Sequence, residues 1–220
     1  MAEETLGLRE RKKRQTAMRI WRTALDLFLE RGYDKVSVAE IAAAAEVSKM
    51  TVFNYFGTKE DVLLRPMEDH VGDPADAVRH RAPGESAVAA VRRQFLAKIA
   101  ERDPSIGLSG DPRLLQLRQL IGDTPALARR AMIFQMRSTE LLADALAEET
   151  GDRLMAGIAA HQLTAARDAV ILENHRRLVA GDSVDAMADD CAALAARAFD
   201  LVEKGLQGYP GNAQAGPSRL

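Results

Sequence analysis

Two short helices, each opened by its own capping residue, restrict the fold of this chain more than any other feature. Ser37 and Glu40 have the S-x-x-E spacing of a capping box, in which each side chain accepts a backbone N–H at the start of a helix. Ser48 is placed to cap a second helix, predicted over residues 49–54, and Gly57 ends that segment. Helices this short are unstable alone, so a longer neighbour must supply their packing surface.

A longer helix is predicted directly before these two, from Arg9 to the glycine at position 32. Thr58 is placed to cap a further helix over about 59–67. A long helix followed by two short helices around a tight turn predicts a helix-turn-helix, whose second helix enters the major groove of DNA. The apolar residues of the long helix recur at the spacing of one helix face: Ile20, Ala24, Leu27 and Phe28.

The rest of the chain also has helical periodicity, so the predicted fold class is all-α. Glycine, proline and capping residues divide it into predicted helices over about 85–102, 124–150, 152–180 and 183–206, with a further helix that begins at Pro112. We expect a helix-turn-helix domain over 9–66 and a second helical domain over 67–206. The tail 207–220 is rich in glycine and proline and is expected to be disordered.

Composition excludes several classes of protein. The net charge of −2 excludes a uniformly basic nucleic-acid coat, although a local basic face remains possible. Cys191 is the only cysteine, which excludes an intrachain disulfide and a multi-cysteine metal site. The four histidines form no ligand-spaced pair, so neither a metal nor a cofactor is expected. No apolar stretch approaches the roughly 18 residues of a membrane span, and a cytoplasmic protein without a membrane partner is expected.

Residues 20–64 resemble the DNA-binding domain of the tetracycline-repressor (TetR/AcrR) family. The resemblance is one unbroken block that covers about a fifth of the chain. The matching segments are Ala24-Leu25-Asp26-Leu27-Phe28, Arg31-Gly32-Tyr33, Ser37-Val38, Glu40-Ile41-Ala42, Ala45, Val47-Ser48, Thr51-Val52-Phe53-Asn54-Tyr55-Phe56 and Lys59-Glu60-Asp61-Val62-Leu63-Leu64. The resemblance implies a transcriptional regulator, usually a repressor, that binds a palindromic double-stranded operator as a homodimer and is released by a small-molecule effector.

The family's DNA contacts carry over to particular positions of this sequence. Lys49 and Met50 open the recognition helix, where family members touch base edges, and Met50 stands where a small residue is frequent. Phe53 replaces a frequent tyrosine and cannot donate a hydrogen bond to phosphate. The remaining expected phosphate contacts are Ser37, Ser48, Thr51, Tyr55 and Lys59.

The C-terminal helices are implied to bind the effector and to form the dimer. The helix over 183–206 has an apolar stripe that includes Cys191, Ala195 and Ala198, and the last two helices pair with their twins in the family. The effector pocket is expected among the helices over 85–102, 124–150 and 152–180, because most such pockets combine an apolar lining with a few polar anchors. Its candidate residues are Phe95, Met132, Phe134, Met136 and Gln162.

Two other classes of function are weighed against a regulator. A small helical enzyme needs a nucleophile with a base, a metal cluster or a phosphate-binding glycine loop, and the sequence shows none of these in a recognisable arrangement. A helical adaptor that binds only protein leaves the pattern from Ser37 to Lys59 unexplained.

Overall fold

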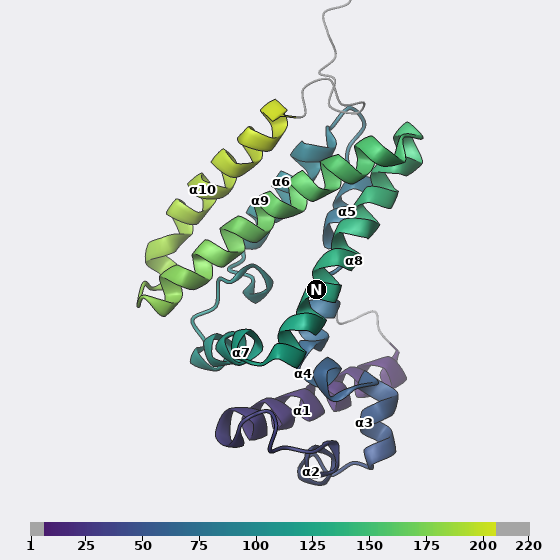
Figure 1. Cartoon of the computed structure of the whole chain (residues 1–220), viewed down its shortest axis with the longest axis vertical. Coiled ribbons are helices and arrows are strands. Elements are labelled where there is room, and N and C mark those ends of the chain that lie inside the picture. The colour runs from purple at the N-terminus through teal and green to yellow at the C-terminus, as the bar shows by residue number, and fades with distance from the viewer. Residues whose placement is uncertain (1–6, 206–220) are drawn as a thin grey trace, which may run out of the picture. The chain divides into compact units, whose positions relative to one another are not determined.

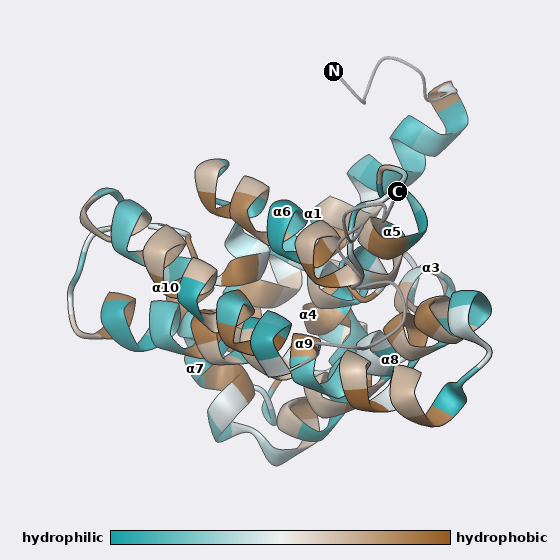
Figure 2. Ribbon diagram, turned by 90° about the horizontal axis from the view of Figure 1, so that it is seen from above, coloured by the Kyte–Doolittle hydropathy of each residue, from teal (hydrophilic) through white to brown (hydrophobic). Residues whose placement is uncertain are grey.

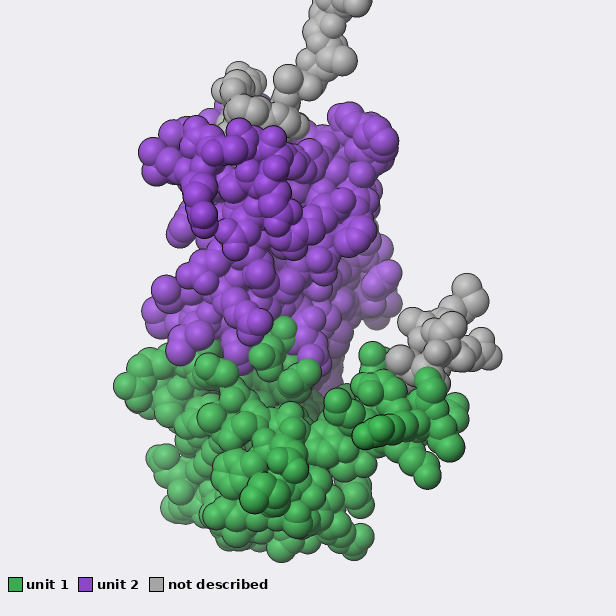
Figure 3. All heavy atoms as spheres, turned by 90° about the vertical axis from the view of Figure 1, so that its right-hand side faces the viewer, with its two compact units in different colours: residues 1–68, 116–131 green, residues 69–115, 132–220 purple. Residues whose placement is uncertain are grey.

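The computed structural model describes residues 7–205, and within that range the chain is all-α, as predicted. It forms two compact units (Figure 3). The first comprises the chain up to Glu68 together with Gln116–Ala131, and the second comprises Asp69–Leu115 and the chain from Met132 onward. The helices are α1 Leu8–Arg31, α2 Val38–Ala44, α3 Lys49–Phe56, α4 Lys59–Glu68, α5 Asp73–Arg79, α6 Ala87–Ala100, α7 Pro112–Asp123, α8 Pro125–Thr150, α9 Arg153–Val179 and α10 Val184–Gly205, with a 3-10 turn at Pro104–Ile106 (Figure 1).

The first unit is built on α1, which carries the packing surface that the short helices need. Ile20, Leu25 and Phe28 of α1 are fully buried, and they form a small core with buried residues of α2, α3 and α4. The indole Nε1 of Trp21 donates a hydrogen bond to the carbonyl of Leu63 at 3.1 Å, which ties α1 to α4. The long helix therefore orients the two short ones.

The predicted caps of this unit are confirmed. The Ser37 side chain accepts the N–H of Glu40, and the Glu40 carboxylate accepts the N–H of Ser37, so the capping box is complete. Ser48 accepts the N–H of Thr51 at the start of α3, and Thr58 accepts the N–H of Asp61 near the start of α4. Each hydroxyl satisfies a backbone donor that a helix start leaves without a partner.

The second unit buries one large apolar cluster, to which α5, α6, α8, α9 and α10 contribute. Helices α9 and α10 run side by side, and α6 packs against both (Figure 1). Along α10, apolar and polar residues alternate at helical spacing (Figure 2), and the buried side includes Met187, Cys191, Ala195 and Phe199. The amphipathic pattern of this helix is therefore largely satisfied inside its own unit.

The structure differs from the sequence prediction in three places. Helix α5 and the 3-10 turn at Pro104–Ile106 were not expected. The first unit also contains the end of α7 and the first two turns of α8, which sequence reasoning had placed with the C-terminal helices. The chain thus passes between units within α7 and within α8. The tail predicted to be disordered lies outside the described residues.

Candidate DNA interface and ligand groove

Helix α3 has one face in the core of the first unit and the other in solvent. Val52 and Phe56 are buried and anchor the helix. On the opposite face Met50 is 66% exposed and Phe53 is 40% exposed, an unusual position for large apolar side chains. Lys49 places its Nζ 5.8 Å from the centre of the Phe53 ring. This face offers a cation and apolar surface together, which suits contact with base edges and thymine methyl groups.

Asn54 is a further exposed residue of α3 that the sequence reasoning missed. It lies one helical turn beyond Met50 and is exposed. Its amide donates and accepts hydrogen bonds, the combination that pairs with adenine in the major groove. The signal was present in the sequence as the i, i+4 spacing from Met50 within the predicted recognition helix.

The start of α3 gathers hydroxyl groups. The Ser48 and Thr51 hydroxyls lie 2.8 Å apart, and Ser48 also caps the helix. Backbone N–H groups and the positive end of the helix dipole make such a start favourable for a phosphate. Tyr55 is half-buried with its ring against Phe56, at 6.3 Å between ring centres, and Ser37 is exposed at the start of α2.

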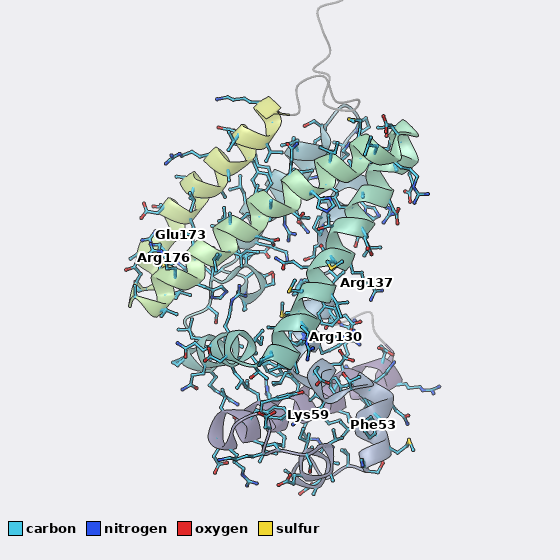
Figure 4. The ribbon with its side chains drawn as sticks, viewed as in Figure 1. Phe53, Lys59, Arg130, Arg137, Glu173 and Arg176 are labelled. Carbon is cyan, nitrogen blue, oxygen red and sulfur yellow. The ribbon has the colours of Figure 1, made fainter. Side chains whose placement is uncertain are left out.

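Lys59, the first residue of α4, is held within the first unit (Figure 4). Its Nζ donates to the carbonyl of Tyr33 at 2.6 Å and lies 4.0 Å from the centre of the Tyr33 ring. Burial lowers the pKa of this ammonium, and burial together with the nearby Glu60 raises the pKa of Tyr33, whose hydroxyl donates to Glu60 at 2.7 Å. An ammonium has three N–H donors, so Lys59 keeps donors for a phosphate while bonded to Tyr33.

Of the expected ligand residues, two line a groove between α8 and α9 in the second unit. The groove has a volume of about 420 Å³. Met132 and Met136 form part of its wall. Phe95 and Phe134 are buried, and neither they nor the half-buried Gln162 belong to the lining. The structure therefore brings together only the two methionines of the expected set.

The polar lining of this groove comes from residues that sequence reasoning missed. The Thr139 hydroxyl donates to the Thr164 hydroxyl at 3.1 Å, and both threonines are buried. Gln135 donates through Nε2 to Asp168 at 2.7 Å. Apolar walls with a few fixed polar groups are the usual composition of small-molecule sites, which span roughly 300–1,000 Å³. No sequence signal separates these threonines from others that bond to their own helix backbone.

The outer face of α9 carries exposed apolar residues, unlike the face of α10 that the sequence singled out. Ala195 is fully buried in its own unit, and the Cys191 thiol donates to Asn174 at 2.9 Å. The large apolar side chains of α9 that remain exposed are Leu154, Met155, Ile158, Leu172 and Val179. The exposed apolar surface of the second unit therefore lies on α9 rather than on the buried stripe of α10.

Two searches of the described residues bear on other functions. Residues 7–205 contain no group of three or more histidine, cysteine, aspartate or glutamate side chains able to hold a metal ion. Over the same range no helix is both long and apolar enough to cross a membrane.

Residues 20–65 match the family model described as bacterial regulatory proteins, tetR family. Over this segment the chain is similar to the tetR family. The matched segment holds the second half of α1, all of α2 and α3, and most of α4, and it lies within the first unit. The regulator TcmR of Streptomyces glaucescens is 37% identical over 123 residues, which are 55% of this chain and 54% of TcmR. The chain thus spans about half the length of this curated relative.

Solved structures share the fold over most of the chain. SmeT in complex with triclosan has a TM-score of 0.55 at 17% identity and covers 94% of this chain and 100% of its own. NalD of Pseudomonas aeruginosa, the secondary repressor of a multidrug efflux pump, has a TM-score of 0.52 at 18% identity and covers 86% of this chain and 97% of its own. Both likenesses concern the fold alone.

Proposed function

We propose that this chain is a homodimeric transcriptional repressor that binds a palindromic operator through α3 and is released by a small-molecule effector. The observation that carries the proposal is the outer face of α3. There Lys49, Met50, Phe53 and Asn54 lie on one exposed surface, on a helix anchored by the buried Val52 and Phe56. Because a bacterial chromosome lies in the cytoplasm, the proposal includes a cytoplasmic location. It assigns the chain no catalytic activity.

Operator binding is tested with DNA that the protein selects itself. Wild-type protein is used to enrich binding sites from a pool of random duplexes, and the enriched sequence is compared with DNA upstream of its own gene. We expect a palindrome with half-sites about 34–36 Å apart, one turn of the double helix. Met50→Ala should weaken binding to this DNA. Met18→Ala, which alters an exposed methionine on α1, is the matched control and should leave binding unchanged. Enrichment of no sequence would count against a regulator and favour the adaptor.

The dimer is proposed to form through the outer face of α9. Ile158 and Leu172 are exposed there, and their spacing of 14 residues places them on one side of the helix. Ile158→Glu or Leu172→Glu should give a folded monomer that binds operator poorly, because the two recognition helices are no longer linked. Ala195→Glu places a charge in the core and should instead lower the midpoint of thermal unfolding. Sedimentation of wild-type protein as a monomer at micromolar concentration would contradict the dimer.

The effector is proposed to enter the groove between α8 and α9. Helix α8 links this groove to the first unit, because its first two turns belong to that unit and later residues line the groove. Arg130 on α8 (Figure 4) pairs with the buried Asp61 of α4 at 2.7 Å. Release of the operator requires a coupling free energy of about 1–3 kcal/mol or more, and the operator must weaken effector binding by the same factor. A ligand that occupies the groove and leaves operator affinity unchanged would contradict this route for that ligand.

A further inference from the structure

Arg167 is a buried cation that the protein does not pair. It lies on the core side of α9 and is only 8% exposed. Among residues 7–205 no carboxylate lies within ion-pair distance of it and no group forms a hydrogen bond with it. Its Nε is fully buried without a partner. Burying a charge without a partner is costly, so such an arginine is rare unless something else supplies the negative charge.

The nearest acidic side chains are engaged elsewhere. Asp168 and Asp73 are the carboxylates whose fields act on Arg167. Asp168 accepts a hydrogen bond from Gln135 at 2.7 Å, and Asp73 pairs with Lys98 at 2.6 Å and with His70 at 2.9 Å. Burial lowers the pKa of the Arg167 guanidinium, and these two carboxylates only partly offset that effect.

Lys98 is a second buried cation of the same unit, and unlike Arg167 it has ion-pair partners within the protein. It is 9% exposed, almost the same as Arg167. Its Nζ lies 2.6 Å from Asp73 and 3.4 Å from Asp103, and it donates to the Ser105 hydroxyl at 2.9 Å. Among the described residues, the fold therefore pairs Lys98 with two carboxylates and gives Arg167 no ion pair.

The surroundings of Arg167 combine an aromatic face with nearby groove residues. Its Cζ lies 5.8 Å from the ring centre of Phe95 on α6. Thr164, one turn earlier on the same face of α9, is buried and also lines the groove between α8 and α9. Helical side chains lean towards the N-terminus of their helix, so Arg167 leans over the turn that contains Thr164.

We propose that Arg167 is the anion-binding residue of the effector site, and that the effector is an apolar or aromatic small molecule bearing a carboxylate or another oxyanion. The guanidinium donates two parallel N–H bonds to the oxyanion. Met132 and Met136 of the groove wall pack against the apolar body of the ligand. The inference rests on the proposed function only in naming this ligand the effector, because binding itself is measurable without DNA.

Two fluorescent probes that differ in one group test the proposal. Anilinonaphthalene sulfonate carries an oxyanion, and phenylnaphthylamine has the same ring system without it. We expect the wild-type protein to bind the sulfonate probe about tenfold or more tightly than the neutral probe, as befits charge-assisted hydrogen bonds. Arg167→Met should abolish this preference and leave the affinity for the neutral probe unchanged. Arg176→Met, which alters an exposed arginine on the same helix, should keep the full preference.

Thermal unfolding separates a binding role from a structural one. Because Arg167 makes no ion pair, Arg167→Met should leave the unfolding midpoint unchanged or raise it. A lowered midpoint together with an unchanged probe preference overturns the proposal, as does equal affinity of wild-type protein for the two probes. If Arg167→Met does not fold, the wild-type protein alone tests the proposal. At equal concentration, the sulfonate probe must raise the unfolding midpoint of the wild-type protein more than the neutral probe does. Neither experiment contains DNA, so these results do not depend on whether the protein binds an operator.

Discussion

The two units differ in the polar side chains that they bury. In the first unit the hydroxyls of Ser37, Ser48 and Thr58 sit at helix starts, where they satisfy backbone donors. Among the described residues of the first unit, the buried polar side chain is that of Asp61, which pairs with Arg130. The second unit buries Lys98, Ser138, Thr139, Thr164, Arg167 and Asn174. The second unit thus has more polar groups in its core than the first, and two of them, Thr139 and Thr164, line the groove between α8 and α9.

The largest effects should come from the apolar cores, where the two units behave alike. Phe28→Ala in the first unit and Phe95→Ala in the second should each lower the free energy of unfolding by about 3–5 kcal/mol, because each ring is almost fully buried. Urea unfolding followed by circular dichroism measures both. The comparison predicts a contrast within the second unit, where Phe95→Ala destabilises and Arg167→Met does not. A similar loss for both variants would show that Arg167 is a structural residue.

The paired carboxylate of the first unit should give the next largest effect. Asp61→Asn removes the charge that faces Arg130, and the loss should be about 2 kcal/mol, less than for a fully buried pair because Arg130 is a third exposed. Arg79→Ala breaks the exposed pair with Glu148 and should cost under about 1 kcal/mol. The two variants are compared by urea unfolding. Equal losses would mean that burial does not distinguish these two pairs.

Helix caps should have smaller effects that are equal in the two units. Ser48→Ala at the start of α3 and Ser86→Ala at the start of α6 each remove a side-chain acceptor for a backbone N–H, at a cost of about 1 kcal/mol. Only Ser48→Ala should also weaken DNA binding, since Ser48 lies beside the exposed face of α3. Unfolding curves and binding isotherms on one operator give both quantities. DNA affinity reduced equally by Ser86→Ala would place the operator contact elsewhere.

The smallest effect concerns the phosphate backbone. Lys59→Ala should weaken operator and scrambled DNA alike, and the slope of log affinity against log salt should become shallower by about one, as expected when one phosphate contact is lost. The hydrogen bond of Lys59 to the Tyr33 carbonyl is also lost, so unfolding is measured in parallel. An unchanged salt slope would assign Lys59 to the internal bond alone.

The two units also differ in how far the sequence predicts them. Capping signals such as Ser37 with Glu40 depend on a few neighbouring residues, so helices α2 and α3 of the first unit are predictable almost residue by residue. Helix α5 begins after Gly72 without a side-chain cap and spans seven residues, which gives too little periodicity to detect. The orientation of a residue in the second unit depends on distant helices. An arginine within a long helix is ordinarily at the surface, and only the packing of α6 against α9 shows that Arg167 is buried.

The candidate effector residues also show that the sequence alone does not tell which side chains distant helices bring together. Met132 and Met136 line the groove between α8 and α9, and Phe95 lies against Arg167, yet the threonines that complete the groove have no distinctive sequence signal. Apolar periodicity on α10 correctly predicted a buried stripe, but periodicity does not say whether another unit or another copy of the chain covers it. The exposed apolar residues of α9 became recognisable only once the neighbours of each helix were known.

The central claim is that α3 reads base sequence, and Lys49 tests it most directly. Affinities of the wild-type protein and of Lys49→Ala are measured on the selected operator and on a scrambled duplex of the same composition, at several salt concentrations. The account predicts that Lys49→Ala reduces discrimination between the two duplexes by about 1–3 kcal/mol, because a base contact is lost as well as a charge. Equal loss on both duplexes, with a shallower salt slope, would place Lys49 on the phosphate backbone and contradict its role in base recognition.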